Sequence, residues 1–234
     1  MERIETRDQV QREAQERLHP PLRNPSYLVL SRRRKIFSTW LQSAGLVNPA
    51  VLDVGGRIQP YRPLLRGNVK NYVAVDLAQS PLVDVRASAS ALPFASDTFD
   101  LVFCTQVLEY LPDPSVAARE IHRVLKPDGI ALLSFASFYP RAVEEEHWRF
   151  LPSGMRFVLE PFRRIEIVSE GTSISGFFRA SCVCFTMFAR VSWLRKVVTS
   201  TIVPVLNLSA DLLERVSDTQ NDQATGNYSV LAQK

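Results

Sequence analysis

The stretch 51–137 constrains the fold most, because it alternates short apolar runs with helical segments and glycine turns. Residues 51–56 (VLDVGG) form a β-branched run ending in two glycines, as expected where a chain leaves a buried parallel strand and a ligand approaches the backbone. Residues 72–77 (YVAVDL) repeat the apolar pattern and contain Asp76 at the expected end of the strand. Asp76 follows the glycine turn by about 20 residues, the spacing at which an acid accepts hydrogen bonds from ribose hydroxyls. Together the two runs predict an adenosine-containing ligand.

Further motifs follow in order along the chain. They are ALPF at 91–94, FDLVFCTQVLEYLPDP at 99–114, REIHRVLKPDG at 119–129 and IALLSFAS at 130–137. The combination resembles the class I S-adenosylmethionine-dependent methyltransferases, in particular the small bacterial members of the methyltransferase type 11 group. The resemblance implies an α/β fold, with a Rossmann-like seven-stranded mixed sheet, helices on both faces and an antiparallel last strand. It also implies an enzyme whose cofactor is S-adenosylmethionine.

The first cofactor contacts that the resemblance implies come from the two strand ends. Asp53 would lie under the glycine turn and orient the amino-acid end of the cofactor. Gly55 and Gly56 would let backbone amides face it, and Asp76, followed by Leu77, would hold the ribose.

The remaining contacts that the resemblance implies lie farther along the chain. Ser88 and Ala89 stand where relatives often have an acid that accepts from the adenine amino group. Here a backbone amide and a hydroxyl would read the adenine instead. Cys104 and Gln106, just past the fourth strand, would line the floor beside the methionine moiety.

The glycine turn departs from the family pattern. Arg57 and Gln59 stand where the later glycines belong, and a residue with a Cβ is disfavoured where φ must be positive. We expect Gly56 to take the strained position by a one-residue shift. The alternative is a non-catalytic protein of the same fold that binds a partner.

Length and composition indicate one domain with additional segments around its core. A chain of 234 residues with 46% apolar content can bury one large α/β core. We divide it into an N-terminal helical cap (1–46), a core (47–175 and 227–234) and an apolar helical insertion (176–226). Within the cap, the helix 27–46 is expected to lie over the cofactor mouth, and its basic run 32–35 is either a phosphate-binding patch or a solvated helix face.

Charge and cysteine content limit the partners and the compartment. The net charge of +4 comes from 28 bases and 24 acids, which is weak evidence for nucleic acid and fits an anionic substrate or a membrane surface equally well. Three cysteines form neither a disulfide framework nor a C-x-x-C site, and the charged N-terminal segment does not resemble a signal peptide. The sequence therefore predicts a cytoplasmic protein, with the inner membrane surface as a further location. No clear metal-ligand spacing occurs, and no metal is predicted.

The loop 138–162 is expected to close over the acceptor. It carries the two candidate bases, Glu145 and His147, of which the histidine suits a hydroxyl acceptor better because its ordinary pKa is near 6.5. The alternative is that His147 only hydrogen-bonds within the loop. Tyr110, after the fourth strand, would either bind the acceptor or pack.

The segment 176–216 is apolar but interrupted by bases. Its longest uncharged stretch, 197–210, contains Pro204 and is shorter than the ~20 residues of a spanning helix, so it is predicted not to cross a membrane. It would form a lid or a homodimer contact, or lie in the membrane interface with its aromatic side chains inserted.

The leading functional hypothesis is methyl transfer to a hydroxyl or carboxyl group of a small-molecule or glycan-type acceptor. The alternative of an RNA or protein methyltransferase is disfavoured, because there is no separate RNA-binding module and no Asn-Pro-Pro-Tyr type motif after the fourth strand. No nucleic-acid partner is therefore favoured.

Overall fold

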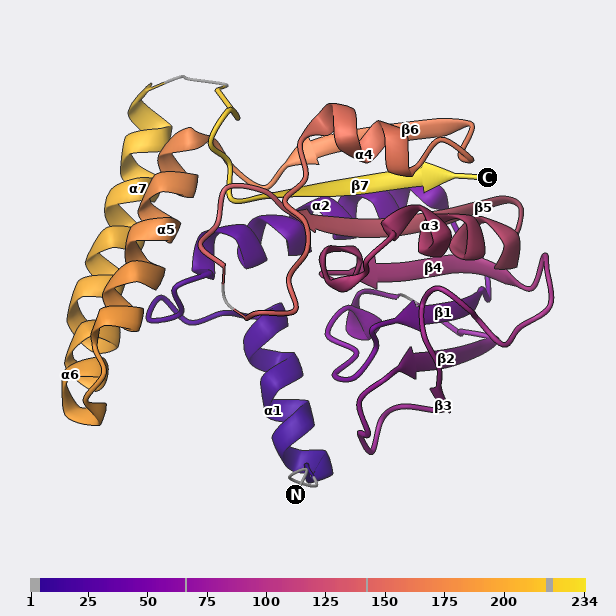
Figure 1. Ribbon diagram of the computed structural model, residues 1–234, viewed down its shortest axis with the longest axis horizontal. Coiled ribbons are helices and arrows are strands. Elements are labelled where there is room, and N and C mark those ends of the chain that lie inside the picture. The colour runs from indigo at the N-terminus through magenta and orange to yellow at the C-terminus, as the bar shows by residue number, and fades with distance from the viewer. Residues whose placement is uncertain (1–4, 66, 142, 218–220) are drawn as a thin grey trace.

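A computed structural model describes residues 5–65, 67–141, 143–217 and 221–234. Its seven strands form one sheet in the order β3-β2-β1-β4-β5-β7-β6 (Figure 1). The strands are β1 (Ala50–Val54), β2 (Asn71–Asp76), β3 (Val85–Arg86), β4 (Phe99–Thr105), β5 (Leu125–Ala136), β6 (Arg164–Ser169) and β7 (Asn227–Gln233). The pairings among β1 to β5 are parallel, whereas β7 runs antiparallel to both β5 and β6. This confirms the predicted mixed sheet and its antiparallel last strand.

Helices cover both faces of the sheet, as predicted. The helices are α1 (Arg7–Leu18), α2 (Tyr27–Ala44), α3 (Pro114–Val124), α4 (Pro152–Val158), α5 (Ser173–Phe188), α6 (Ser192–Val197) and α7 (Val203–Ser217), with short helical turns η1 (Arg62–Leu64), η2 (Leu108–Tyr110) and η3 (Val198–Ile202). Ile121 of α3 and Met155 of α4 are buried in the core on one face, and Phe37 of α2 is buried in the core on the other. Both faces of β1 are therefore buried, which explains why its sequence is an almost continuous apolar run.

The helix α2 packs on the sheet along most of its length, and only its first turns come near the ligand site. Phe37 and Trp40 pack with Val51 of β1 and Phe103 of β4 on the face of the sheet. Arg17 near the C-terminal end of α1 lines the cleft described below. Val29 and Leu30 of α2 line an adjoining hollow that shares Arg17 with this cleft.

The basic run 32–35 on α2 is largely structural. Arg33 is buried and donates to both carboxylate oxygens of Glu170, at 2.7 and 2.8 Å. Arg32 forms an ion pair with Glu214, and Arg34 donates to the backbone oxygen of Leu18 at 3.3 Å. The interpretation of the run as a phosphate-binding patch was therefore wrong for these arginines, which bind the protein itself.

The apolar insertion is built from α5, α6, η3 and α7. It begins at Ser173, three residues before the predicted boundary, because the Thr172 hydroxyl accepts a hydrogen bond from the Ile174 backbone N–H at 3.2 Å and caps α5. Helix α6, η3 and α7 form one continuous helical run, Ser192–Ser217, of 26 residues. By length and composition alone this run is sufficient to cross a membrane, because the helix continues on both sides of the uncharged stretch 197–210.

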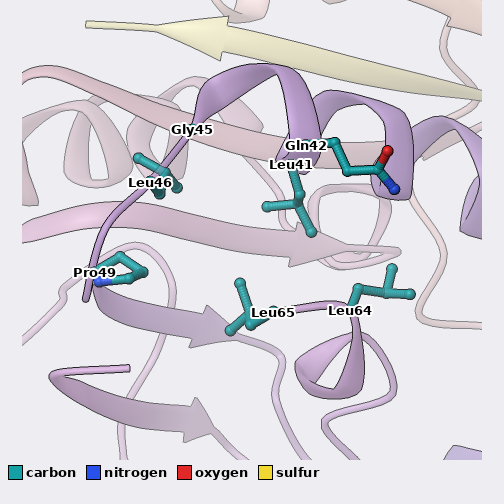
Figure 2. A pocket seen from close by; sticks show the side chains of 7 residues that line it. All are labelled: Leu41, Gln42, Gly45, Leu46, Pro49, Leu64 and Leu65. Atoms are coloured by element: carbon teal, nitrogen blue, oxygen red, sulfur yellow. The ribbon is translucent and has the colours of Figure 1, made fainter. Parts of the chain in front are cut away.

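A hollow of about 350 Å³ lies between the C-terminal end of α2 and η1 (Figure 2). Leucine side chains and Pro49 dominate its lining, and Gln42 supplies the polar side chain. Because Pro49 directly precedes β1, the hollow lies at the amino end of that strand. Ligands of open α/β sheets bind at the opposite, carboxyl ends of the strands. The hollow is therefore not the candidate site.

Candidate active site

A cleft of about 500 Å³ opens at the carboxyl ends of the parallel strands. Gly55 follows β1, Asp76 ends β2, Gln106 follows β4 and Ala136 ends β5, and all four line the cleft. This is the edge where strand order reverses around β1 and β4, and where open α/β sheets place their ligands.

One end of the cleft suits a nucleoside. The Asp76 carboxylate accepts from the backbone N–H of Ala78 at 2.8 Å and from that of Arg57 at 3.2 Å, which fixes its direction. Leu77, which is 61% exposed, and Ala89 lie beside it and supply an apolar surface. A carboxylate next to an apolar wall can accept from ribose hydroxyls while a planar ring packs on the wall.

The glycine turn after β1 is arranged differently from the expectation. Gly55 has φ +75°, and a Cβ there would lie 2.3 Å from Cγ2 of Val107. Gly56 does not have a positive φ, and the second positive φ of the turn, +50°, falls on Gln59. The predicted shift of the strained position to Gly56 was therefore wrong. Gly56 is required for space, because its Cβ would lie 2.7 Å from the Asp53 backbone oxygen.

The amides of this turn are already paired within the protein. The N–H groups of Gly55 and Gly56 both donate to the backbone oxygen of Val75, at 2.8 and 3.1 Å. The expectation that these two amides face the cofactor was wrong in this conformation. The turn therefore lets a ligand approach the backbone closely, but its two glycine N–H groups are not free to donate to that ligand.

Three further predicted cofactor contacts lie outside the cleft lining. Asp53 is buried and accepts from the Tyr72 hydroxyl at 2.5 Å, and burial raises its pKa to about 7. Cys104 is buried in the core, where burial raises the pKa of its thiol far above the ordinary value. The Ser88 hydroxyl accepts from the Ser90 backbone N–H at 3.2 Å. The structure therefore brings Gly55, Asp76, Leu77, Ala89 and Gln106 together in the cleft lining, but neither these three residues nor Gly56.

The predicted bases are also outside the cleft. Glu145 and His147 are both exposed, whereas Glu146 between them lines the cleft. The backbone N–H of His147 donates to the backbone oxygen of Glu109 at 2.8 Å, which holds this stretch in place while Glu146 lines the cleft. The structure therefore corrects the prediction of Glu145 and His147 as catalytic residues, because neither side chain lines the cleft. Glu146 forms an ion pair with Arg149 at 2.6 Å.

Arg179 of α5 lines the cleft and was missed by the sequence analysis. It is 6% exposed, and its guanidinium lies 4.1 Å from the centre of the Tyr139 ring. It donates to the Gly226 oxygen at 3.3 Å, to the Ser26 hydroxyl at 3.4 Å and to the Asn227 side chain. No carboxylate of the described residues forms a salt bridge with it.

Arg179 is therefore a buried cation whose protein partners are neutral. Burial lowers its pKa to about 10, so it still carries its charge at neutral pH. A buried charge is stabilised by an opposite charge. Together with Arg17, which lines the same cleft, it makes this wall a binding position for an anionic group.

Arg57 explains one departure from the glycine pattern. Its guanidinium donates to both carboxylate oxygens of Glu5, at 2.6 and 2.8 Å, and to Glu13 of α1 at 2.5 Å. Arg57 itself lines the cleft, so these ion pairs hold α1 at the cleft mouth. Within the described ranges, no group of three His, Cys, Asp or Glu side chains could hold a metal ion.

Glu109 next to this site predicts a pH dependence of stability. It is 1% exposed, its Oε2 has no hydrogen-bond partner in the described structure, and burial raises its pKa from 4.5 to about 7. Between these values the folded state holds a proton that the unfolded state has lost. The stabilisation is therefore fully present below about pH 4.5 and is lost as the pH rises through about 7.

Glu109→Gln should remove this contribution. In urea unfolding, the free energy of unfolding should fall between about pH 5 and about pH 8 in both proteins. The fall should be about 2 kcal/mol smaller in the variant than in the parent. The exposed Glu160→Gln is the matched control and should keep the parent's slope. Asp53, whose pKa is also raised to about 7, contributes in the same direction and remains in both variants. Equal slopes in the parent and Glu109→Gln would contradict the assignment.

Comparison with known proteins agrees with this geometry. Residues 52–133 match a family model described as a methyltransferase domain. A ubiquinone biosynthesis O-methyltransferase of Pseudomonas aeruginosa (strain UCBPP-PA14) is 30% identical over 139 residues, which cover 52% of this chain and 57% of that protein. A malonyl-[acyl-carrier protein] O-methyltransferase of Halorhodospira halophila is 38% identical over 110 residues, 41% of this chain and 37% of that protein. The matches to these curated relatives thus cover less than two thirds of their length.

Solved structures show the same fold. A putative sarcosine dimethylglycine methyltransferase from Galdieria sulphuraria superposes with a TM-score of 0.54 at 12% sequence identity. The superposition covers 86% of each chain. It therefore extends well beyond the region matched by the family model.

Proposed function

The chain belongs to the class I S-adenosylmethionine-dependent methyltransferases, and from this premise we propose that it transfers a methyl group from S-adenosylmethionine to an oxygen of a small-molecule or glycan-type acceptor. The observation that carries the proposal is the cleft itself. It joins Asp76, which suits a ribose, to a wall that contains Tyr139 and Arg179. The names of the two curated relatives, both O-methyltransferases, support oxygen as the methylated atom.

The residues of the cleft fit the cofactor. Asp76 would accept from the ribose hydroxyls, Leu77 and Ala89 would pack against the adenine, and Gln106 would lie near the methionine end. A cleft of about 500 Å³ is within the usual range for small-ligand sites. When bound, S-adenosylmethionine supplies an already activated methyl group on a sulfonium, so the protein's task is alignment of the acceptor.

The buried Arg179 supports a carboxylate as the acceptor, in preference to a hydroxyl. A carboxylate is already an anion, so its methylation needs no base, and Glu146 of the cleft lining is already paired with Arg149. Its oxygen would form the bond to the methyl carbon while the S–CH₃ bond breaks and the electron pair stays on sulfur. The acceptor's negative charge and the sulfonium's positive charge cancel, and no proton is released.

Calorimetric titration with S-adenosylmethionine and S-adenosylhomocysteine tests the cofactor site. The parent protein should bind both, and Asp76→Ala should bind about 10- to 100-fold more weakly, because hydrogen bonds to a charged group contribute about 1.5–3 kcal/mol each. The matched control is Asp211→Asn on α7, outside the cleft, which should leave the affinity unchanged. No binding by the parent would favour the non-catalytic alternative instead.

A panel of acceptors then separates the enzyme classes. Small carboxylic acids, sugars and hydroxylated metabolites should yield methylated products in the presence of S-adenosylmethionine. Methylation of RNA or of a protein fraction, with no small-molecule product, would overturn the proposed acceptor class while leaving the cofactor assignment intact.

A further inference from the structure

The insertion exposes many large apolar side chains to solvent. On the surface of α5, α6 and the turn between them, Phe177 is 61%, Phe188 79% and Trp193 63% exposed. The outer side of α7 continues this surface with further exposed valines and leucines, such as Val205 and Leu212. Contiguous exposed apolar surface on a folded protein marks an interaction site.

The charges at the end of the insertion formed by α6 are all of one sign, whereas α7 carries Asp211 and Glu214 farther along the chain. Between Glu170 and Asp211 the sequence contains no acidic residue. Arg190, Arg195 and Lys196 fall in the turn after α5 and in α6, beside the exposed Phe188 and Trp193. We call residues 185–197 the tip of the insertion. Exposed aromatic side chains next to bases, without acids, are the composition of helices that lie on anionic lipid.

The position of the tip leaves it accessible. In Figure 1 the helices α5 to α7 form a column at one side of the sheet, and α6 lies at the end of the column, away from the strands. The tip can therefore approach a flat surface without collision with the sheet.

The long helical run does not behave as an independent span. The Asn207 side chain in α7 donates to the backbone oxygens of Leu22 and Asn24, at 2.8 and 3.0 Å. Glu214 in the same helix accepts from the Thr172 backbone N–H at 2.9 Å and pairs with Arg32. These polar contacts tie α7 to the folded domain along its length and would have to be broken for the helix to enter a bilayer alone.

A second copy of the chain fits the tip less well than lipid does. In a two-fold symmetric contact the same patch occurs on both partners. Such a contact through the tip would bring two sets of the bases Arg190, Arg195 and Lys196 together without intervening acids. Anionic headgroups instead complement these charges.

We propose that the tip binds the surface of an anionic membrane. Phe188 and Trp193 enter the boundary between headgroups and acyl chains, and Arg195 and Lys196 contact the headgroups. The protein then works as a peripheral enzyme on a leaflet rich in anionic lipid, such as the cytoplasmic one.

Flotation of the full chain with lipid vesicles tests this inference. With vesicles of phosphatidylcholine and phosphatidylglycerol the protein should float, and it should float less with phosphatidylcholine alone or at high salt. Phe188→Ser/Trp193→Ser should weaken the partitioning at least about tenfold, because one fully buried aromatic side chain is worth about 1.5–3 kcal/mol. Arg195→Ser/Lys196→Ser should remove the preference for phosphatidylglycerol.

The matched control lies on α4. Arg156→Ser/Phe157→Ser removes one exposed base and a phenyl ring that is 78% exposed, and this variant should float like the parent. Circular dichroism of all variants checks that the fold is kept. A blue shift of tryptophan fluorescence on addition of anionic vesicles should disappear in Trp193→Phe.

Two results would overturn the inference. The parent protein would remain at the bottom of the gradient with anionic vesicles, or it would float equally well after Phe188→Ser/Trp193→Ser. Absence of flotation together with concentration-dependent sedimentation that this double variant abolishes would assign the tip to self-association instead.

Discussion

Arg33→Met is expected to destabilise the protein by about 3–5 kcal/mol, the cost of removing one partner from a buried ion pair. Arg33 is 1% exposed and Glu170 is fully buried. The carboxylate of Glu170 accepts from Arg33 and, at 2.7 Å, from the Ser229 hydroxyl. Without the guanidinium, this carboxylate would stay buried between α2 and the strands with only a hydroxyl donor.

Urea unfolding followed by circular dichroism measures the effect. Lys35→Met on the same helix removes an exposed base and should change the stability by no more than about 0.5 kcal/mol. Arg33→Met/Glu170→Leu should recover part of the loss, because it removes the unpaired charge as well. If Arg33→Met were as stable as Lys35→Met, the buried pair would not contribute as the geometry indicates.

Arg179→Gln is expected to lower kcat/KM for a carboxylate acceptor by about 30-fold or more, because truncation of one partner of a buried, hydrogen-bonded charge pair costs about 2–5 kcal/mol. Its affinity for S-adenosylhomocysteine should stay within a factor of about two, since Asp76 and the apolar wall are unchanged. Urea unfolding of the variant accompanies the kinetics, because the substitution also alters the buried hydrogen bonds of Arg179 to Ser26, Gly226 and Asn227.

Steady-state kinetics with a carboxylic acid and its neutral amide analogue measures this effect. The parent should prefer the acid, and the variant should lose that preference. Arg156→Gln, an exposed arginine on α4, is the control and should keep it. A fall in activity that is equal for acceptors with and without a carboxylate would assign Arg179 a structural role instead.

Much of the sheet could be predicted from the sequence, because its signals are local. The runs that became β1, β2, β4 and β5 are short, apolar and bounded by glycines or acids. The position of Asp76 at a strand end follows from the same pattern, and the structure places its carboxylate in the cleft.

The burial of Arg33 could have been predicted from helical periodicity, but the neighbouring bases pointed to a solvated surface. Residues 33, 37 and 40 recur at helical spacing, which puts Arg33 on the same face as Phe37 and Trp40. Since Arg33 stands within four consecutive bases, composition suggested a solvated patch while periodicity pointed to the core. The periodicity was the better guide.

The acceptor wall could not be predicted in this way. Arg17 and Arg179 lie about 160 residues apart in the sequence, and only the packing of α1 and α5 brings them to one cleft. Glu146 lies in a loop without a repeating pattern, so nothing local distinguished it from Glu145 and His147. Residues of this kind are placed by tertiary contacts and not by propensity.

The single helix α5 connects the two ends of the proposed activity. Arg179 lies in its first half and Phe188 is its last residue, nine positions on. At 1.5 Å per residue the two positions are about 14 Å apart along the helix axis. With the axis of α5 along the membrane normal, a membrane-anchored acceptor would therefore need a tether of at least about 14 Å to reach Arg179. Soluble acids and acceptors on long flexible tethers meet this condition, and acceptors fixed directly at the bilayer surface do not.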